Sequence, residues 1–133
     1  MRAPNISLAA ALFLGTGAIA AAGVGTSPTE IPSLSAKDAG ARYGEAAGAV
    51  LVCYGLKITP RVAALRARYQ GDELAEFDTQ AGKILSAWRE TLNCTHADGP
   101  NDCKVSQQWS CQQAMQEIGP AGSKVPGLVE PKN

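Results

Sequence analysis

Apolar residues recur at intervals of three and four in the middle of the chain, the spacing of one face of an α-helix. Ser35 and Asp38 form an S-x-x-D start signal, in which the hydroxyl accepts a backbone N–H. Gly55 is a residue that commonly closes a helix. These signals predict a first helix from Ser35 to about Tyr54. Its stripe consists of Ala39, Tyr43, Ala46, Ala47, Val50, Cys53 and Tyr54.

Two further helices are expected next. Thr59 and Pro60 form an N-cap followed by a proline at the first helical position, and Gly71 closes this short second helix. Asp72 is the predicted cap of a third helix, over 73–92. Its stripe is Leu74, Phe77, Ala81, Ile84, Leu85, Trp88 and Leu92. Within it, Phe77, Ile84, Leu85 and Trp88 are expected to be buried together.

A fourth helix is predicted over about 103–118, after a turn-rich loop at 95–102 and before Gly119 and Pro120. Its broad apolar face comprises Val105, Trp109, Cys111, Met115 and Ile118. No segment alternates apolar and polar residues as a half-buried strand does. We therefore expect an all-α fold, a small bundle of about four helices over 35–119. Residues 120–133 are expected to form an irregular C-terminal tail, in which Leu128 and Val129 can dock onto the domain.

The first 22 residues have the layout of a secretory signal peptide. Arg2 precedes an apolar run, and small residues with A-x-A spacing end it at Ala18, Ala20 and Ala22. The run is too short and too broken by glycine to span a bilayer well, which takes about 20 apolar residues. This layout predicts cleavage, export to the periplasm or the outside, and no stable membrane insertion. A flexible leader over 23–34 would then precede one domain.

The four cysteines are an even number, which suits two disulfides in an exported protein. Cys103 and Cys111 lie eight residues apart on one predicted helix, about 12 Å apart, and a disulfide needs less than about 7 Å between Cα atoms. We expect Cys94 with Cys103 and Cys53 with Cys111. The cross-pairing of Cys53 with Cys103 and of Cys94 with Cys111 stays open. A zinc site of His96 with the neighbouring cysteines is the weaker reading, since the spacing matches no common zinc motif.

Charge excludes one class of partner. Removal of Arg2 with the signal peptide leaves 11 basic side chains against 12 acidic ones, a net charge near −1. This balance lacks the basic field that nucleic-acid binding requires. No cofactor motif is present in the sequence, and we assign no cofactor.

No catalytic constellation emerges from the sequence. His96 is the single histidine, and it lies in a loop without a nucleophile motif. Four acidic residues lie at the start of the third helix, and two interpretations fit them: stabilisation by the helix dipole, or a catalytic acid–base pair. They are Asp72, Glu73, Glu76 and Asp78. Arg61, Arg66 and Arg68 decorate the second helix, either as an anion site or as a solvated face paired with the acids that follow.

A ridge of small residues is the most unusual pattern in the expected mature chain. Gly40, Gly44 and Gly48 are spaced by four, with Ala36 one step earlier. Each glycine in a helix costs about 1 kcal/mol relative to alanine, so a close contact should use them. We expect close packing of a neighbouring helix within the domain. A docking groove for a partner or a second copy is the alternative.

In outline, the chain resembles small helical exported proteins that act by binding, such as inhibitors, immunity proteins and acid-stress chaperones. The first hypothesis is therefore a non-enzymatic exported protein that binds a protein partner, with its oligomeric state left open. A small secreted enzyme that uses carboxylates and a carrier of an apolar ligand are the alternatives. A shallow apolar patch favours the first, a deep pocket joining His96 to carboxylates the second, and a large dry cavity the third.

Overall fold

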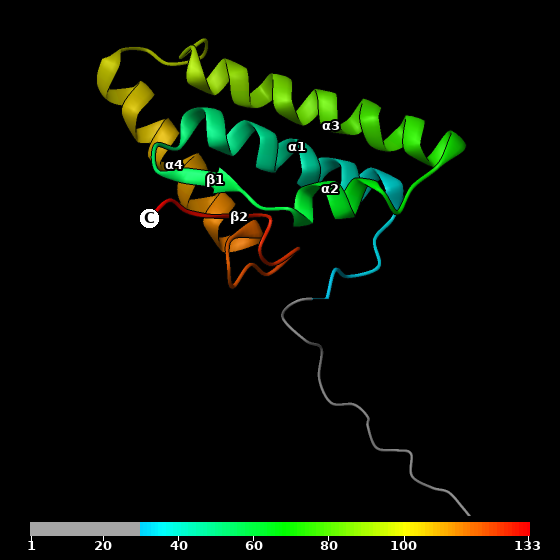
Figure 1. The fold of residues 1–133 in the computed structure, drawn as a ribbon. Coiled ribbons are helices and arrows are strands. Elements are labelled where there is room, and N and C mark those ends of the chain that lie inside the picture. The colour runs from blue at the N-terminus through cyan, green and yellow to red at the C-terminus, as the bar shows by residue number, and fades with distance from the viewer. Residues whose placement is uncertain (1–29) are drawn as a thin grey trace, which may run out of the picture. The chain divides into compact units, whose positions relative to one another are not determined.

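The chain folds into four helices and one short antiparallel ladder, within the part described by the computed structural model, residues 30–133 (Figure 1). The predicted signal peptide, 1–22, and most of the predicted leader lie outside these residues. The expected all-α bundle with two disulfides is confirmed. The elements are α1 (Ala36–Val52), β1 (Leu56–Ile58), α2 (Arg61–Arg66), α3 (Gly71–Leu92), α4 (Pro100–Ile118) and β2 (Val129–Pro131).

The predicted start signals lie at the helix starts, but three helices begin at other residues than expected: α2 begins at Arg61, with Pro60 rather than Thr59 as its N-cap. Ser35 Oγ accepts the backbone N–H of Asp38 at 3.1 Å and caps α1. Thr59 Oγ1 accepts the N–H of Arg61, the first residue of α2, at 3.2 Å. Helix α3 begins at Gly71 rather than after Asp72. Helix α4 begins at Pro100 rather than Cys103, because a proline suits the first helical position, where no intrahelical N–H bond is lost.

The seam between α1 and α3 is the closest packing in the fold, and the glycine ridge makes it. A Cβ added at Gly40 would overlap the carbonyl of Phe77, and one at Gly44 the carbonyl of Ala81. At Gly48 the side chain of Trp88 lies directly on the backbone. The two helices run side by side along this seam (Figure 1). The ridge therefore packs within the domain, and the docking alternative is wrong because these glycines are buried.

Three aromatic rings fill the core beside this seam. Phe77 is fully buried, with its ring centroid 5.2 Å from Tyr43 in an edge-on contact and 5.3 Å from Tyr69. Trp88 is also buried, whereas Ile84 and Leu85 are only half-buried. The expectation of one joint cluster on α3 is therefore correct for two of the four residues. The glycine ridge contacts the face of α3 that carries Phe77, Ala81 and Trp88. The side chains beside that face stay partly exposed.

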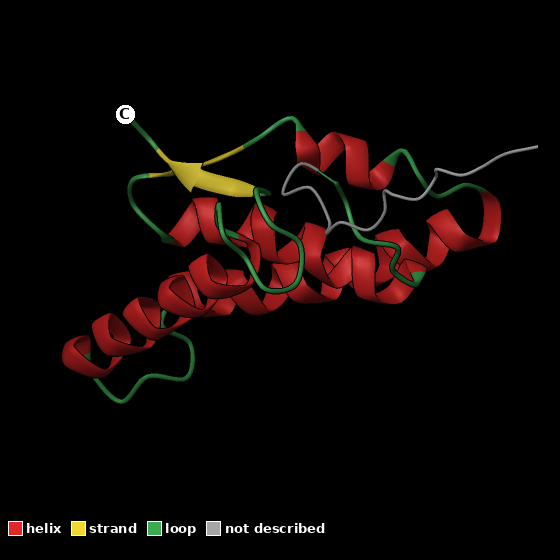
Figure 2. Ribbon diagram, turned by 90° about the horizontal axis from the view of Figure 1, so that it is seen from below, coloured by secondary structure: helices red, strands yellow, loops and turns green. Residues whose placement is uncertain are grey.

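The C-terminal tail belongs to the core to a greater extent than its sequence predicts. Val125, Leu128 and Val129 are fully buried, so the expected docking of the last two is confirmed. The prediction of an irregular tail is wrong at β2, which pairs antiparallel with β1 on the α1 and α4 side of the bundle (Figure 2). Gly127, at φ +81°, permits the turn that brings these residues in. Three-residue strands are too short to show an alternating pattern.

The end of the predicted leader is also held. Tyr69 Oη donates to the carbonyl of Leu34 at 2.6 Å, and Arg68 Nη1 donates to the carbonyls of Ile31 and Pro32 at 2.9 and 2.8 Å. The side chains of Ile31 and Leu34 pack against the core. Residues 31–34 are thus fixed to the domain, which corrects their assignment to a flexible leader.

Both disulfides attach α4 to the rest of the fold. Cys53, the C-cap of α1, pairs with Cys111, and Cys94 pairs with Cys103, as expected; the cross-pairing does not occur. The Cα–Cα distances are 5.6 and 5.3 Å. Chain entropy alone assigns these loops roughly 4 and roughly 3 kcal/mol of stabilisation.

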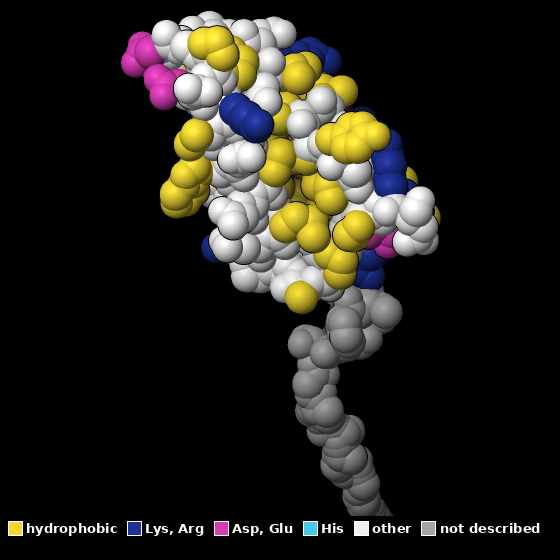
Figure 3. Space-filling view, turned by 90° about the vertical axis from the view of Figure 1, so that its left-hand side faces the viewer, with side chains coloured by type: hydrophobic (Ala, Val, Ile, Leu, Met, Phe, Trp, Pro, Cys, Tyr) yellow, Lys and Arg dark blue, Asp and Glu magenta, His cyan; other side chains and the backbone are white. Residues whose placement is uncertain are grey.

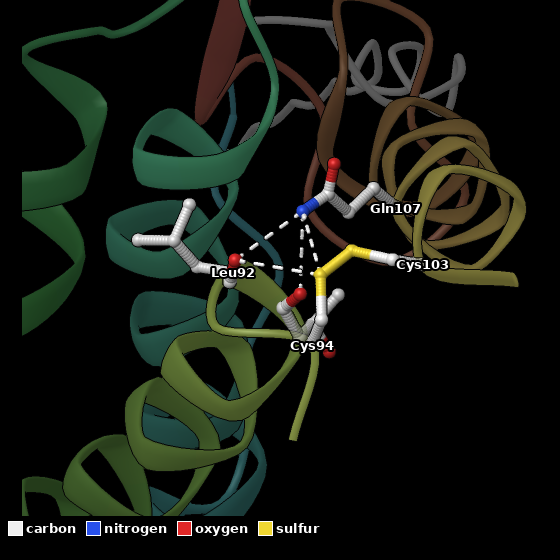
Figure 4. The surroundings of a disulfide bond; sticks show 5 residues. Leu92, Cys94, Cys103 and Gln107 are labelled. Atoms are coloured by element: carbon white, nitrogen blue, oxygen red, sulfur yellow. Dashed lines mark hydrogen bonds between the residues drawn. A yellow bond between two sulfur atoms is a disulfide. The ribbon is translucent and has the colours of Figure 1, made fainter. Parts of the chain in front are cut away.

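A side chain of α4 supports the second bridge. Gln107 Nε2 donates to the carbonyls of Thr91 and Leu92 at 3.3 and 3.4 Å, and lies 3.8 Å from Cys94 Sγ (Figure 4). These carbonyls belong to the last turn of α3, and that of Thr91 also accepts the backbone N–H of Cys94 at 3.2 Å. Gln107 therefore adds a side-chain donor at the end of α3 and holds α4 beside it. Among residues 30–133, no helix combines the length and the apolar character that a membrane span requires.

The glycine seam gives a matched pair of substitutions. Gly44→Ala should destabilise the protein by about 1–3 kcal/mol, because the added methyl meets the backbone of Ala81, which cannot rotate away. Gly82→Ala, in the interior of α3 with nothing within 4 Å, should stabilise it by up to about 1 kcal/mol. Urea unfolding of both variants tests this. Two shifts of the same sign would contradict the assignment of the seam.

Candidate functional site

Helix α4 is the least buried of the long helices, and candidate sites lie on both sides of it. Only Ala114 and Ile118 of its side chains are buried. Val105 and Trp109 were expected on its apolar face, but they are 52% and 70% exposed. The prediction that the apolar face of α4 is buried is therefore wrong for Val105 and Trp109. The disulfides fix α4 at a position where these two side chains point outward.

The first candidate is an apolar surface beside the Cys53–Cys111 bridge, called here the Trp109 surface. It is an open hollow of about 560 Å³ lined by Tyr54, Leu56, Val105, Trp109 and Met115 together with the bridge. The Tyr54 side chain is fully exposed. Figure 3 looks onto the end of the molecule where the C-terminus lies, and hydrophobic side chains gather over the middle of that face.

The chemistry of the Trp109 surface is that of an interface core. No charged residue occurs between Val105 and Gln116 on α4, and the polar side chains on its rim are the amides of Gln108 and Gln112. Protein interfaces are enriched in Trp, Tyr and Met at the centre and depleted of charge there. Large aromatic residues also carry most of the binding free energy in many complexes.

The second candidate is a hollow between α1, α3 and α4, called here the carboxyl pocket. It has a volume of about 320 Å³, and its lining includes Arg42, Glu45, Ile84, Trp88, Gln113 and Glu117. Arg42 Nη1 bonds Glu45 Oε2 at 2.6 Å and Glu117 Oε1 at 2.9 Å. One guanidinium nitrogen thus serves two carboxyl groups and links α1 to α4.

Glu45 is the chemically unusual member of this group. Its side chain is 8% exposed, and it is the one buried charged residue in the part of the chain that the structure describes. Burial raises the pKa of Glu45 from 4.5 to about 8. The positive charge of Arg42 lowers this pKa, and the negative charge of Glu117 raises it. Glu45 therefore holds a proton at neutral pH.

His96 lies on the surface, in a hollow of about 350 Å³ whose lining also includes Glu90, Asp98, Asp102 and Ser106. Its side chain is 78% exposed, and Nε2 lies 3.3 Å from Glu90 Oε2. Its described contacts include no serine hydroxyl or thiol. The zinc reading fails because Cys94, Cys103 and Cys111 are all in disulfides and offer no thiolate. Among residues 30–133, no three acidic, histidine or cysteine residues are grouped to hold a metal.

The charged residues singled out on α2 and α3 do not meet in one site. Arg66 and Asp78 form a bidentate pair at 3.0 and 2.8 Å, which fits the reading of a solvated paired face. This contact lowers the pKa of Asp78. Arg61 donates to the carbonyl of Pro126 and Arg68 to the segment before α1, so the anion site is not formed. Asp72, Glu73 and Glu76 are exposed at the start of α3.

The carboxyl pocket was not predicted from the sequence. Arg42 and Glu45 are three apart on α1, a spacing that predicts a contact between them, but it also suits a solvated pair. Glu117 is 75 residues from Arg42 in sequence. Trp109 and Tyr54 were assigned to helix faces, and only the packed fold shows that they are exposed.

The comparisons with known proteins give no guide to the site, so the site is interpreted from its own geometry. No protein-family model, no curated protein and no solved structure matches the chain.

The raised pKa of Glu45 predicts how stability depends on pH. The folded state holds the proton more tightly than the unfolded state, so this contribution is full below about pH 4.5 and is lost as the pH rises through about 8. Glu45→Gln keeps the shape and carries no proton to lose. Urea unfolding at about pH 6 and about pH 9 should show a smaller loss of stability in Glu45→Gln than in the wild type.

A matched carboxylate provides the control for this measurement. Glu76, on α3, is exposed and lies outside the carboxyl pocket. Glu76→Gln should therefore follow the wild-type profile. Equal pH profiles for the wild type and Glu45→Gln would show that Glu45 does not titrate in this range.

Proposed function

We propose that the protein is exported and acts without catalysis, by binding a protein partner through the Trp109 surface. The observation that carries this proposal is the pairing of Trp109, 70% exposed, with the fully exposed Tyr54 over one hollow. Exposing two large aromatic side chains to water has no benefit for the fold. An exposed apolar patch rimmed by polar groups is the usual mark of an interaction site.

The way in which this surface is held supports the same proposal. Tyr54 follows Cys53, and Trp109 lies two residues before Cys111, so the disulfide joins the two segments that carry the aromatic anchors. A surface fixed before binding loses less conformational entropy when the partner arrives. The bridge therefore preorganises the surface.

Export is proposed on two grounds. The first is the signal-peptide layout of residues 1–22. The second is that all four cysteines of the chain are paired in disulfides, which persist in oxidising compartments. We propose the periplasm or the extracellular space as the compartment.

The two alternatives have less support. For a secreted enzyme, His96 is 78% exposed and its side-chain contact is with Glu90 rather than with Ser106, which lines the same hollow. Glu45 and Glu117 are both bound to Arg42 Nη1. For a carrier of an apolar ligand, the Trp109 surface is an open hollow rather than an enclosed cavity.

The test is capture of a partner from the exported fraction by the oxidised mature protein and its variants. Trp109→Ala should weaken binding by about 30-fold or more, the loss expected of an aromatic anchor. His96→Ala, exposed and outside the surface, should bind as the wild type does. Thermal unfolding should show that both variants keep the wild-type stability. A partner that binds Trp109→Ala and the wild type equally would refute the proposal.

A further inference from the structure

We propose that the carboxyl pocket binds an alkylammonium group, supplied either by a free amine or by a lysine side chain. This site does not rest on the Trp109 surface, and no residue that argues for it lies in that surface. The proposal stands on three features of the pocket: its shortage of hydrogen-bond donors, its apolar wall and its size.

The shortage of donors is read from the hydrogen bonds of the two carboxyl groups. Among the described residues, their donors are Arg42 Nη1 and, at 3.5 Å from Glu117 Oε1, the amide of Gln113. Both donors reach the same oxygen of Glu117, and Glu45 Oε1 receives neither. Carboxyl groups accept several hydrogen bonds each, so this pair has more acceptors than donors. An ammonium group supplies three N–H donors and a positive charge.

The apolar part of the pocket lining suits a hydrocarbon chain. Ile84, Ala87 and Trp88 of α3 line the pocket, and Ala41 of α1 adds a small side chain. A lysine-like ligand has this mixed character, because its methylene stem packs on apolar surface while its charged head stays among polar groups. An acidic ligand would meet two carboxyl groups, and a purely apolar one would add no donor to those that Arg42 and Gln113 supply.

The size of the pocket fits a small ligand. Its volume of about 320 Å³ lies at the lower end of the range of about 300–1,000 Å³ found for small-molecule sites. It opens between three helices, so a ligand enters without unfolding the bundle. Two residues that line the pocket are held in place: Trp88 packs directly on the backbone of Gly48, and Glu117 forms an ion pair with Arg42.

Binding is coupled to a proton. Burial raises the pKa of Glu45 to about 8, so this carboxyl group holds a proton at neutral pH, and the proton takes the place of a cation beside Glu117. An entering ammonium displaces it, and the proton passes to solvent. Affinity should therefore rise with pH, roughly tenfold per pH unit below about pH 8, because the ionised fraction of Glu45 rises by that factor. Simple amines stay protonated over this range.

Trp88 is the natural reporter, and Trp109→Phe makes it the single tryptophan of the chain. Titration of this variant with n-butylamine should give a saturable change in Trp88 fluorescence. n-Butanol, the neutral molecule of nearly the same shape, should bind at least tenfold more weakly. The change with n-butylamine should also strengthen between about pH 6 and about pH 8.

Substitutions then locate the site. Glu45→Gln should weaken n-butylamine binding at least tenfold and remove its pH dependence. Glu117→Gln is a second, independent loss of charge in the same pocket. Glu76→Gln, outside the pocket, should bind as the parent does.

A second ligand distinguishes the two sources of the ammonium group. Nα-acetyl-lysine N-methylamide presents the lysine side chain as a protein would. If it binds together with n-butylamine, the pocket accepts a lysine of a protein; if n-butylamine alone binds, the pocket accepts free amines. The proposal is overturned if neither ligand gives a saturable change, if n-butanol binds as well as n-butylamine, or if the two pocket variants bind like the parent.

Discussion

The contact between the glycine ridge of α1 and the backbone of α3 is the constraint on which the rest of the structure depends. Helices pack at a distance set by the side chains between them, and here one partner has none at three successive turns. The axis of α3 therefore comes close enough for its carbonyls to lie on α1. This seam fixes Phe77 in the aromatic cluster and Trp88 on Gly48.

Such close packing of two helices leaves the third long helix without a groove of its own. Helix α4 buries only two side chains completely and is attached by other means: two disulfides, the Gln107 amide on the end of α3, and the Arg42–Glu117 ion pair. The C-terminal tail then covers the end of α4 through Val125 and Leu128. Covalent and polar attachments tolerate gaps that a hydrophobic core does not, so hollows persist on both sides of α4.

These hollows differ in chemistry because they face different parts of α4. The side toward Tyr54 carries apolar and amide groups, which suit a protein surface. The side toward α1 and α3 carries Glu45, Arg42 and Glu117 above an apolar wall. A small domain with little core thus has two hollows of different chemistry beside one helix.

The sequence by itself determined the features that depend on close neighbours along the chain. The Ser35 cap and the helix types follow from spacings of a few residues, and the reach of a disulfide excludes a bridge between Cys103 and Cys111. The pairing of Cys94 with Cys103 and the packing of the glycine ridge were expected, but each left one alternative that only the structure removed. The ends of the helices were predicted less well. Gly71 was expected to close α2 but begins α3, and Pro100 was expected in a loop but begins α4.

Only the tertiary structure decided which side chains meet across long separations. The apolar spacing on α4 predicted that Trp109 would be buried, but the disulfide at Cys111 sets the rotation of the helix and turns it outward. Glu45 resembles any surface glutamate until Glu117, far along the chain, lies beside it and water is removed. Burial and its effect on a pKa depend on all the elements packed around a group, and no local pattern records them.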